Sequence, residues 1–171
     1  LGPGIGREPE TAAFVQALLM CPSRPSAVVD ADALHALAMH PEALSSLRAC
    51  DVLTPHPGEA ATLLHTTPAL VQADRFAALA GRRLAPSVWI LKGAGTLIGT
   101  EGQPVTIAPY AEPNLAVGGS GDVLSGCLGT LMAQTAAHPS EGCESSSFLA
   151  ACMGVHLHAR AGRLLREAFP Q

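Results

Sequence analysis

The sequence has few aromatic and few charged residues. Phe, Trp and Tyr make up 4% of the 171 residues and charged residues 14%, while hydrophobic residues make up 48%. A core of this composition is built mainly from Ala, Leu and Val, which favours helices packed tightly on a sheet over an aromatic-cored β-sandwich. The length suffices for one domain with a sizeable core, so we predict a single domain over residues 1–171.

Basic runs, long apolar spans and paired cysteines are also lacking. The net charge is −4 and the chain contains a single lysine, Lys92, which argues against nucleic acid as a partner. No apolar span reaches membrane length, so we expect no membrane association. The five cysteines are scattered without C-x-x-C spacing. This pattern argues against a disulfide frame or a zinc site and predicts reduced thiols in a cytoplasmic protein.

The chain begins on a turn sequence, Leu1-Gly2-Pro3-Gly4, and has no initial Met. Turn residues at the very start of a domain indicate that preceding residues are missing. We therefore expect the chain to be the C-terminal part of a longer protein.

Short apolar strands alternate with helical patterns along the chain. Residues 27–29, 51–54 and 88–91 are predicted strands, and each is followed by a polar or glycine-containing turn. Parallel strands joined by helices form a doubly wound α/β sheet, and ligands gather at the carboxyl ends of such strands. The sequence therefore predicts an α/β fold with a mostly parallel sheet, and it places Asp30 and Asp32 on the functional edge.

The helical patterns also predict which side chains are packed. In the helix expected at residues 8–20, the packed face contains Phe14, Leu18 and Leu19 because these residues share one side of a helix. A second helix is expected at residues 68–83. Its predicted inward residues are Leu70, Val71, Phe76, Leu79 and Ala80, and its predicted outward residues are Asp74, Arg75, Arg82 and Arg83.

A glycine-rich segment at residues 114–126, Asn-Leu-Ala-Val-Gly-Gly-Ser-Gly-Asp-Val-Leu-Ser-Gly, runs directly into an apolar helical pattern. Its glycines permit a tight turn and a close approach to a ligand. The first turn of the helix would present free N–H groups and the positive end of the helix dipole, which together bind phosphate. Asp122 lies at this helix start, where a carboxylate either caps the helix or takes a proton from a substrate hydroxyl.

Two further loops carry polar groups at strand ends. His56 lies between Pro55 and Pro57, and because the prolines stiffen the loop, we predict a binding role for this imidazole. Lys92 opens the glycine loop at residues 92–96, where an ammonium suits a phosphate, although a surface lysine in a turn would give the same pattern. The remaining histidines lack such a context and are predicted to be structural or exposed: His35, His40, His65, His138, His156 and His158.

In an alternating β/α chain, four of these loops converge on one rim: residues 2–6, 54–59, 92–96 and 114–122. They offer two phosphate-cradling turns, one cation, one positioned imidazole and one base. The turn at residues 2–6 is the weaker of the two phosphate candidates, because a glycine turn is most often only a turn. This combination predicts phosphoryl transfer to a hydroxyl.

The same motifs resemble a known family. The segments GPGIG, VVDADAL, LTPHPGE, LKGAGT and NLAVGGSGDVLSG, in this order, are similar to those of the nucleotide-dependent NAD(P)H-hydrate dehydratases. These enzymes belong to the ribokinase-like superfamily and form the C-terminal half of many bifunctional nicotinamide-nucleotide repair proteins. The resemblance covers nearly the whole chain. It implies a three-layer α/β/α fold whose N-terminal part is missing, a homo-oligomer, and fusion to or pairing with an NAD(P)HX epimerase domain.

The resemblance also implies a reaction. ADP, or ATP in eukaryotic members, would phosphorylate the ring hydroxyl of hydrated NADH or NADPH (NAD(P)HX). Elimination of phosphate would then regenerate the dihydropyridine and leave AMP from ADP, or ADP from ATP. Asp122 would contact the substrate as the catalytic base, while Gly4 and His56 would bind the dinucleotide. Magnesium is implied, with Glu59 as the candidate ligand. The implied nucleotide-binding residues are Lys92, Gly93, Ala94, Gly95, Thr96, Asn114, Gly119, Ser120 and Gly121.

Two other functions are compatible with these residues. A small-molecule kinase of the same superfamily, of the hydroxyethylthiazole or pyridoxal type, would use the same phosphate-binding loops but release a stable phosphorylated product. A catalytically inactive nucleotide-binding domain would bind nucleotide without turnover. Product analysis separates the first from a dehydratase, and binding without turnover would identify the second.

Overall fold

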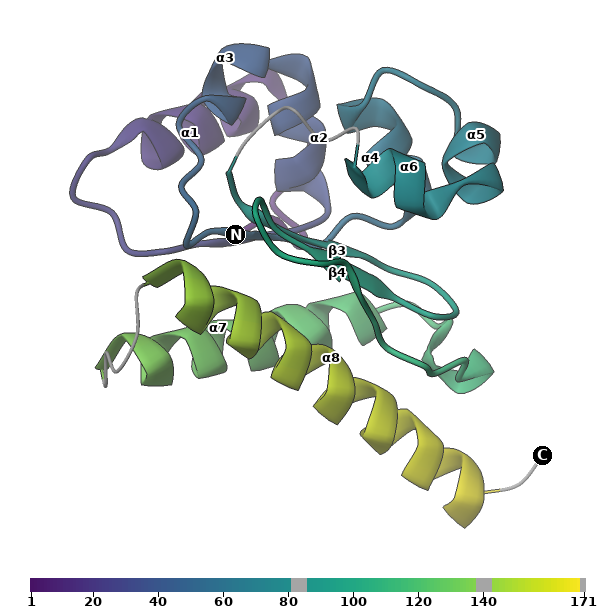
Figure 1. Ribbon diagram of the computed structural model, residues 1–171. Helices are drawn as coiled ribbons and strands as arrows, with labels where there is room; N and C mark the ends of the chain where they lie inside the picture. Colours follow the sequence, from purple (N-terminus) through teal and green to yellow (C-terminus); the bar gives the residue numbers. More distant parts are fainter. Residues whose placement is uncertain (81–85, 138–142, 170–171) are drawn as a thin grey trace.

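The computed structural model describes residues 1–80, 86–137 and 143–169, and its centre is a five-stranded sheet (Figure 1). Strands β1, β2 and β3 are parallel neighbours, β4 is antiparallel to β3, and β5 is antiparallel to β4. All strands except β4 therefore run in one direction, which confirms the mostly parallel sheet. The strands are β1 (Val28–Val29), β2 (Val52–Leu53), β3 (Val88–Leu91), β4 (Leu97–Gly99) and β5 (Thr106–Ile107).

Helices cover both faces of this sheet (Figure 1). The first six helices lie on one face: α1 (Pro9–Met20), α2 (Asp32–Met39), α3 (Pro41–Leu44), α4 (Pro57–Leu63), α5 (Pro68–Ala73) and α6 (Arg75–Ala80). The 3₁₀ turn η1 (Pro113–Leu115) leads to α7 (Ser120–Ala137), and α7 and α8 (Cys143–Ala168) cover the other face. The predicted three-layer α/β/α architecture is confirmed.

Strands β1 to β3 are continuous apolar runs because side chains from each of them pack into two cores, one on each face of the sheet. Successive side chains of a strand point to opposite faces of the sheet, so Val88 and Ile90 pack with the α7 residue Leu128. Trp89 and Leu91, from the same strand, pack into the core beneath α1 to α6. All four side chains of β3 are buried, as expected for a strand covered on both faces.

A buried ion pair lies at the amino ends of β1 and β2. Arg24 Nη1 donates to Asp51 Oδ1 at 2.8 Å, and the two side chains are 2% and 0% exposed. Arg24 also donates to the carbonyl of Leu19, while the Asp51 carboxylate accepts from the backbone of Ala27 and Arg48. These bonds satisfy both charges and join the end of α1 to the starts of two strands.

The packed face of α1 differs from the prediction. Val15 and Leu19 are buried, whereas Phe14 is 58% and Leu18 38% exposed. Both pairs are spaced by four residues, so each forms a stripe along the helix. The neighbouring stripe is the one that contacts the core, and the prediction for Phe14 and Leu18 was wrong.

The helix predicted at residues 68–83 is two helices, α5 and α6, as far as it is described. The helix is interrupted at Asp74. The Oδ1 of Asp74 accepts a hydrogen bond from the N–H of Ala77 at 2.8 Å, as the capping residue of a new helix does. Leu70, Phe76 and Ala80 are exposed, contrary to the prediction, which assumed one continuous helix. Val71 and Leu79 are buried as predicted, and residues 81–83 lie outside the described residues.

Cys21, Cys50, Cys127 and Cys152 are free thiols, as expected from their scattered positions. Within the described parts of the chain, no helix combines the length and the hydrophobicity needed to cross a membrane.

Candidate functional site

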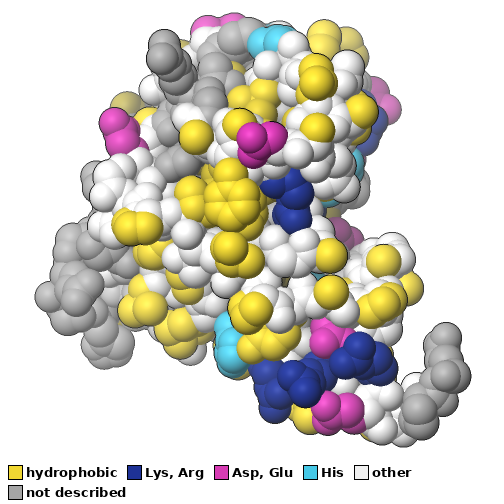
Figure 2. All heavy atoms as spheres, turned by 45° about the vertical axis from the view of Figure 1, so that its right-hand side comes forward, with side chains coloured by type: hydrophobic (Ala, Val, Ile, Leu, Met, Phe, Trp, Pro, Cys, Tyr) yellow, Lys and Arg dark blue, Asp and Glu magenta, His cyan; other side chains and the backbone are white. Residues whose placement is uncertain are grey.

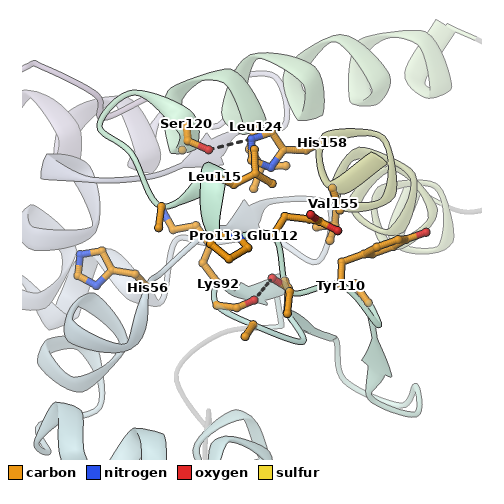
Figure 3. Close-up of a pocket in the computed structure, with 18 of the residues that line it drawn as sticks. His56, Lys92, Tyr110, Glu112, Pro113, Leu115, Ser120, Leu124, Val155 and His158 are labelled. Atoms are coloured by element: carbon orange, nitrogen blue, oxygen red, sulfur yellow. Dashed lines mark hydrogen bonds between the residues drawn. The ribbon is translucent and has the colours of Figure 1, made fainter. Parts of the chain in front are cut away.

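A cavity of about 550 Å³ lies between the loops that follow β3 and β5, the start of α7 and the middle of α8 (Figure 3). Loops from distant parts of the sequence line it, including the His56 loop, the loop that begins at Lys92 and the start of α7. Pockets of this size hold small-molecule ligands and cofactors. The cavity brings together seven predicted site residues: His56, Lys92, Gly93, Ala94, Thr96, Ser120 and Gly121.

Lys92 lies in a network of carboxylates at the cavity wall. Its Nζ is 2.8 Å from Asp30 Oδ1 and 3.8 Å from Glu59 Oε2. Ser125, on α7, donates its hydroxyl to Asp30 Oδ2 at 2.7 Å. Through these two contacts, Asp30 connects the carboxyl ends of β1 and β3 to α7. The sequence placed Asp30 on this edge but assigned it no role.

The Asp30 carboxylate is held in its charged form. Burial alone would raise its pKa, but the hydrogen bond and charge of Lys92, with further bonds from Ser125 and Thr54, lower the pKa below its usual value. The Asp30 side chain is only 2% exposed. A buried carboxylate already paired with an ammonium is a poor proton acceptor, so Asp30 fixes Lys92 instead of exchanging protons with a substrate.

The start of α7 lies directly against this ion pair. The helix begins at Ser120, so residues 120–122 form its first turn, with N–H groups that the helix itself cannot satisfy. A Cβ built on Gly121 would be 3.4 Å from Lys92 Nζ and 3.7 Å from Asp30 Oδ2. The missing side chain thus leaves room beside an ammonium and a helix N-terminus, two groups that attract phosphate.

Capping hydrogen bonds hold the His56 loop in addition to the two prolines. His56 Nδ1 accepts from the N–H groups of Gly58 and Glu59 at 3.0 and 3.2 Å, and Glu59 Oε2 accepts from the His56 N–H at 2.8 Å. This reciprocal pair is a capping box at the start of α4. Because Nδ1 accepts, a neutral ring would have its proton on Nε2, and this nitrogen lies 3.5 Å from Glu59 Oε1.

Glu59, the predicted magnesium ligand, is occupied by these contacts. Its carboxylate caps α4 and faces Lys92. Within residues 1–80, 86–137 and 143–169, no group of three His, Cys, Asp or Glu side chains is placed to hold a metal ion. The role of Glu59 as a magnesium ligand stays a prediction.

Arg75 points inward, so the prediction that it faces outward was wrong. Its guanidinium donates to the carbonyls of Leu91 at 2.8 Å, Ala94 at 2.6 Å and Gly95 at 3.1 Å. Five N–H donors in a fixed plane suit such a cluster of carbonyls. Arg75 thereby fixes the loop at residues 92–96, although its polarity in a helical pattern gave no sign of this contact.

The opposite wall of the cavity contains groups that the sequence did not indicate. His158 lines the cavity, and its Nε2 is 3.1 Å from Ser120 Oγ (Figure 3). This hydrogen bond agrees with the structural role predicted for His158, but the sequence did not place the residue at the cavity. Burial, followed by the charge of Lys92, lowers the pKa of His158 and outweighs a bond to Ser120. Tyr110 also lines the cavity, and its hydroxyl is 2.8 Å from Nδ1 of the exposed His156.

Other predicted site residues lie outside the cavity lining. Asn114 donates its amide to the Gly162 carbonyl at 2.6 Å and thereby holds η1 on α8. Gly4 is exposed in the first loop and Gly119 in the turn before α7. Gly95, whose carbonyl binds Arg75, completes the loop after Lys92. Asp122, at the start of α7, follows the lining residue Gly121 and has no hydrogen bond or ion pair with any described residue.

A sequence model of a family described as NAD(P)H-hydrate dehydratase matches residues 1–170. The chain belongs to the NAD(P)H-hydrate dehydratase family. It is 43% identical over 163 residues to the bifunctional NAD(P)H-hydrate repair enzyme Nnr of Moorella thermoacetica, a match that covers 95% of this chain and 29% of that enzyme. It is 37% identical over 172 residues to the ADP-dependent (S)-NAD(P)H-hydrate dehydratase of Neisseria meningitidis serogroup B, a match that covers 98% of this chain and 55% of the relative.

Solved structures of ribokinase-like proteins have the same fold. A ribokinase-like superfamily protein of Enterococcus faecalis superposes with a TM-score of 0.78 at 22% identity, over 98% of this chain and 55% of that protein. An ADP/ATP-dependent NAD(P)H-hydrate dehydratase of Bacillus subtilis, co-crystallised with ATP and Mg²⁺, superposes with a TM-score of 0.74 at 24% identity, over 98% and 56% of the two chains. The present chain thus spans about half the length of each of these two proteins.

Proposed function

We propose that this chain takes part in the nucleotide-dependent dehydration of hydrated NADH or NADPH, a lyase reaction. ADP or ATP would phosphorylate the ring hydroxyl, and loss of phosphate would restore the dihydropyridine. The observation that carries the proposal is the cavity in which Lys92, His56 and the start of α7 meet in a member of the NAD(P)H-hydrate dehydratase family. The name of the Neisseria relative, an ADP-dependent (S)-NAD(P)H-hydrate dehydratase, supports ADP as a phosphoryl donor.

The phosphates of the nucleotide would lie between Lys92 and the first turn of α7. The ammonium would donate to a phosphate oxygen, and the N–H groups of residues 119–122 would stabilise charge on the transferred phosphoryl group. Of these, the N–H of Ser120 donates to the carbonyl of Val117 at 3.3 Å and would have to exchange that bond. The loop at residues 93–96 would surround the remaining phosphate oxygens, and Arg75 would keep this loop in place through its carbonyls. Any magnesium would arrive bound to the nucleotide, since that ion is commonly held by substrate phosphates and few carboxylates.

Asp122 would take the proton of the substrate hydroxyl. It lies at the same helix start as the proposed phosphate site and has no competing partner among the described residues. Asp30, the other carboxylate nearby, is neutralised by Lys92. The two acids would thus have separate tasks, one free to accept a proton and one fixing a cation. The Nε2–H of His56 would donate to the dinucleotide, with Gly4 on the same side.

The wider biological setting belongs to the same proposal. Exposed apolar side chains on α8, among them Leu149, Met153 and Leu157, would suit a homo-oligomer. The bifunctional repair enzymes among the relatives support a protein in which an NAD(P)HX epimerase domain accompanies this chain. The free thiols agree with the reducing cytoplasm predicted from cysteine usage.

Incubation with NAD(P)HX and ADP or ATP tests the proposal. Recovery of the absorbance of the reduced nicotinamide, with one AMP formed per ADP consumed, is expected, whereas a kinase would accumulate a phosphorylated product. Asp122→Asn should reduce turnover by roughly 10²–10⁴-fold and leave AMP binding unchanged. Glu10→Gln, an exposed change on α1 across the sheet, is the matched control. Full activity of Asp122→Asn would show that another group is the base, and no recovery with the full-length protein would refute the dehydratase function.

A further inference from the structure

Glu112 is a buried carboxylate in the cavity wall with an unused acceptor. The residue precedes η1 and lines the cavity, and its side chain is only 6% exposed. Its Oε2 has no hydrogen bond in the described part of the protein. The Nε of Arg166 lies 3.4 Å from this oxygen, but that arginine does not line the cavity, and basic side chains gather on the outer surface of α8 (Figure 2).

A carboxylate has about four acceptor positions, and leaving them unused in a buried site is unfavourable. Arg166 supplies charge compensation from outside, but its distance from Oε2 exceeds that of a charge-assisted hydrogen bond, about 2.7–2.9 Å. Oε2 itself is closed off from solvent, so the acceptor available to a ligand with N–H or O–H donors is Oε1, which has no hydrogen bond or ion pair with any described residue.

The surroundings of Glu112 indicate what kind of ligand this is. Figure 3 shows its carboxylate beside Tyr110 and Val155, on the side of the cavity away from His56. The neighbouring lining is apolar and consists of Pro113, Leu115, Leu124, Val155 and Ala159.

The other polar side chains at this end are already paired. Tyr110 bonds to His156, and His158 bonds to Ser120. Asn114 also has an unpaired Oδ1, but it does not line the cavity. Glu112 is thus the acceptor left in an apolar compartment that opens toward an anion-binding end at Lys92.

We propose that Glu112 recognises the nucleoside end of the bound nucleotide by accepting hydrogen bonds from its ribose hydroxyls or its exocyclic amine. This inference rests on the proposed function, in which the phosphates lie at Lys92 and α7. The base and sugar then occupy the apolar compartment, and both present donors that a carboxylate binds. Glu112 would make the site selective for nucleotides that have those donors, since a buried acceptor left unpaired by the wrong ligand weakens binding.

A cycle of variants and ligand analogues tests this assignment by calorimetry. The ligands are ADP, 2′-deoxy-ADP, 3′-deoxy-ADP and purine riboside 5′-diphosphate, which lacks the amine. In the unmodified protein, the analogue that lacks the contacted donor should bind about 10- to 100-fold more weakly than ADP. In Glu112→Leu, ADP should fall to the affinity of that analogue, whose own affinity should not change. The analogue that is affected identifies the ribose or the amine.

Two further variants make the outcome decisive. Glu101→Leu, in an exposed turn, should keep the full discrimination. Glu112→Gln preserves the shape and one acceptor without the charge, and should reduce discrimination to about 3- to 10-fold, a readout that remains if Glu112→Leu fails to fold. Equal binding of all four ligands to the unmodified protein, or equal losses for all four in Glu112→Leu, would refute the assignment. A protein that binds neither ADP nor ATP would refute the proposed function and this inference with it.

Discussion

Replacing Gly121 by Ala should separate nucleotide binding from stability. The residue lies in the first turn of α7, and a Cβ there would meet nothing closer than Lys92 Nζ at 3.4 Å. The added methyl therefore fits the folded protein, and alanine is the better helix former by about 0.5–1 kcal/mol at interior helix positions. The free energy of unfolding of Gly121→Ala should be no lower than that of the unmodified protein.

Binding should respond in the opposite direction. A phosphate oxygen bonded to the Lys92 ammonium lies about 2.7–2.9 Å from its nitrogen, in the space that the methyl group introduced by Gly121→Ala would fill. A hydrogen bond to a charged group contributes about 1.5–3 kcal/mol, so ADP affinity should fall by about 10- to 100-fold. Titration calorimetry measures the affinity, and thermal unfolding measures the stability.

Gly126→Ala is the matched control for this experiment. It lies on the same helix, and a Cβ at this position meets no atom within 4 Å. It should stabilise the fold by about 0.5–1 kcal/mol and leave ADP affinity unchanged. If Gly121→Ala binds ADP as tightly as Gly126→Ala does, the phosphates do not lie beside Lys92 at the start of α7, and the reasoning fails.

Three other predictions concern stability, pH and the loop after β3. Arg24→Met leaves Asp51 buried without its partner and should lower the free energy of unfolding in urea by about 3–5 kcal/mol, whereas the exposed change Arg160→Met should have little effect. Burial lowers the pKa of His158, so below about pH 6.5 the unfolded chain binds more protons than the folded one. Stability should therefore fall between pH 7 and 5, and an unchanged slope in His158→Gln would contradict this. Arg75→Met removes the donors that fix the carbonyls of the loop and should weaken ADP binding about tenfold, with Arg160→Met again as control.

The parts of the fold that depend on local chemistry were predictable. The apolar run at residues 88–91 forms β3 with those bounds, and the glycine-rich turn leads into α7. Alternation of strands and helices also placed His56 and Lys92 at one edge, because parallel strands end on the same side. The cavity contains both residues.

Contacts between distant residues were not predictable. Ser120 reaches His158 and Tyr110 reaches His156 across 38 and 46 positions of sequence. No local pattern signals which turn of a long helix will face a cavity. For the same reason, no role could be predicted for Glu112.

The polarity of a side chain did not predict its location where backbone carbonyls could accept its hydrogen bonds. Arg75 was expected at the surface because charged residues are mostly exposed, yet loop carbonyls accept hydrogen bonds from both of its terminal nitrogens. In α1, the pattern placed Phe14, Leu18 and Leu19 on one packed face, whereas only Leu19 of these three is buried. Tertiary structure settles such cases, since either choice satisfies the helix itself.

Lys92 is the only lysine of the chain, and its ammonium lies in the cavity wall, paired with Asp30. Acylating reagents that attack primary amines therefore have one side-chain target in this chain. A molecule seated over Lys92 would shield it further. The rate of acylation at Lys92, measured by mass spectrometry, would thus report whether a ligand occupies the cavity, without any engineered label.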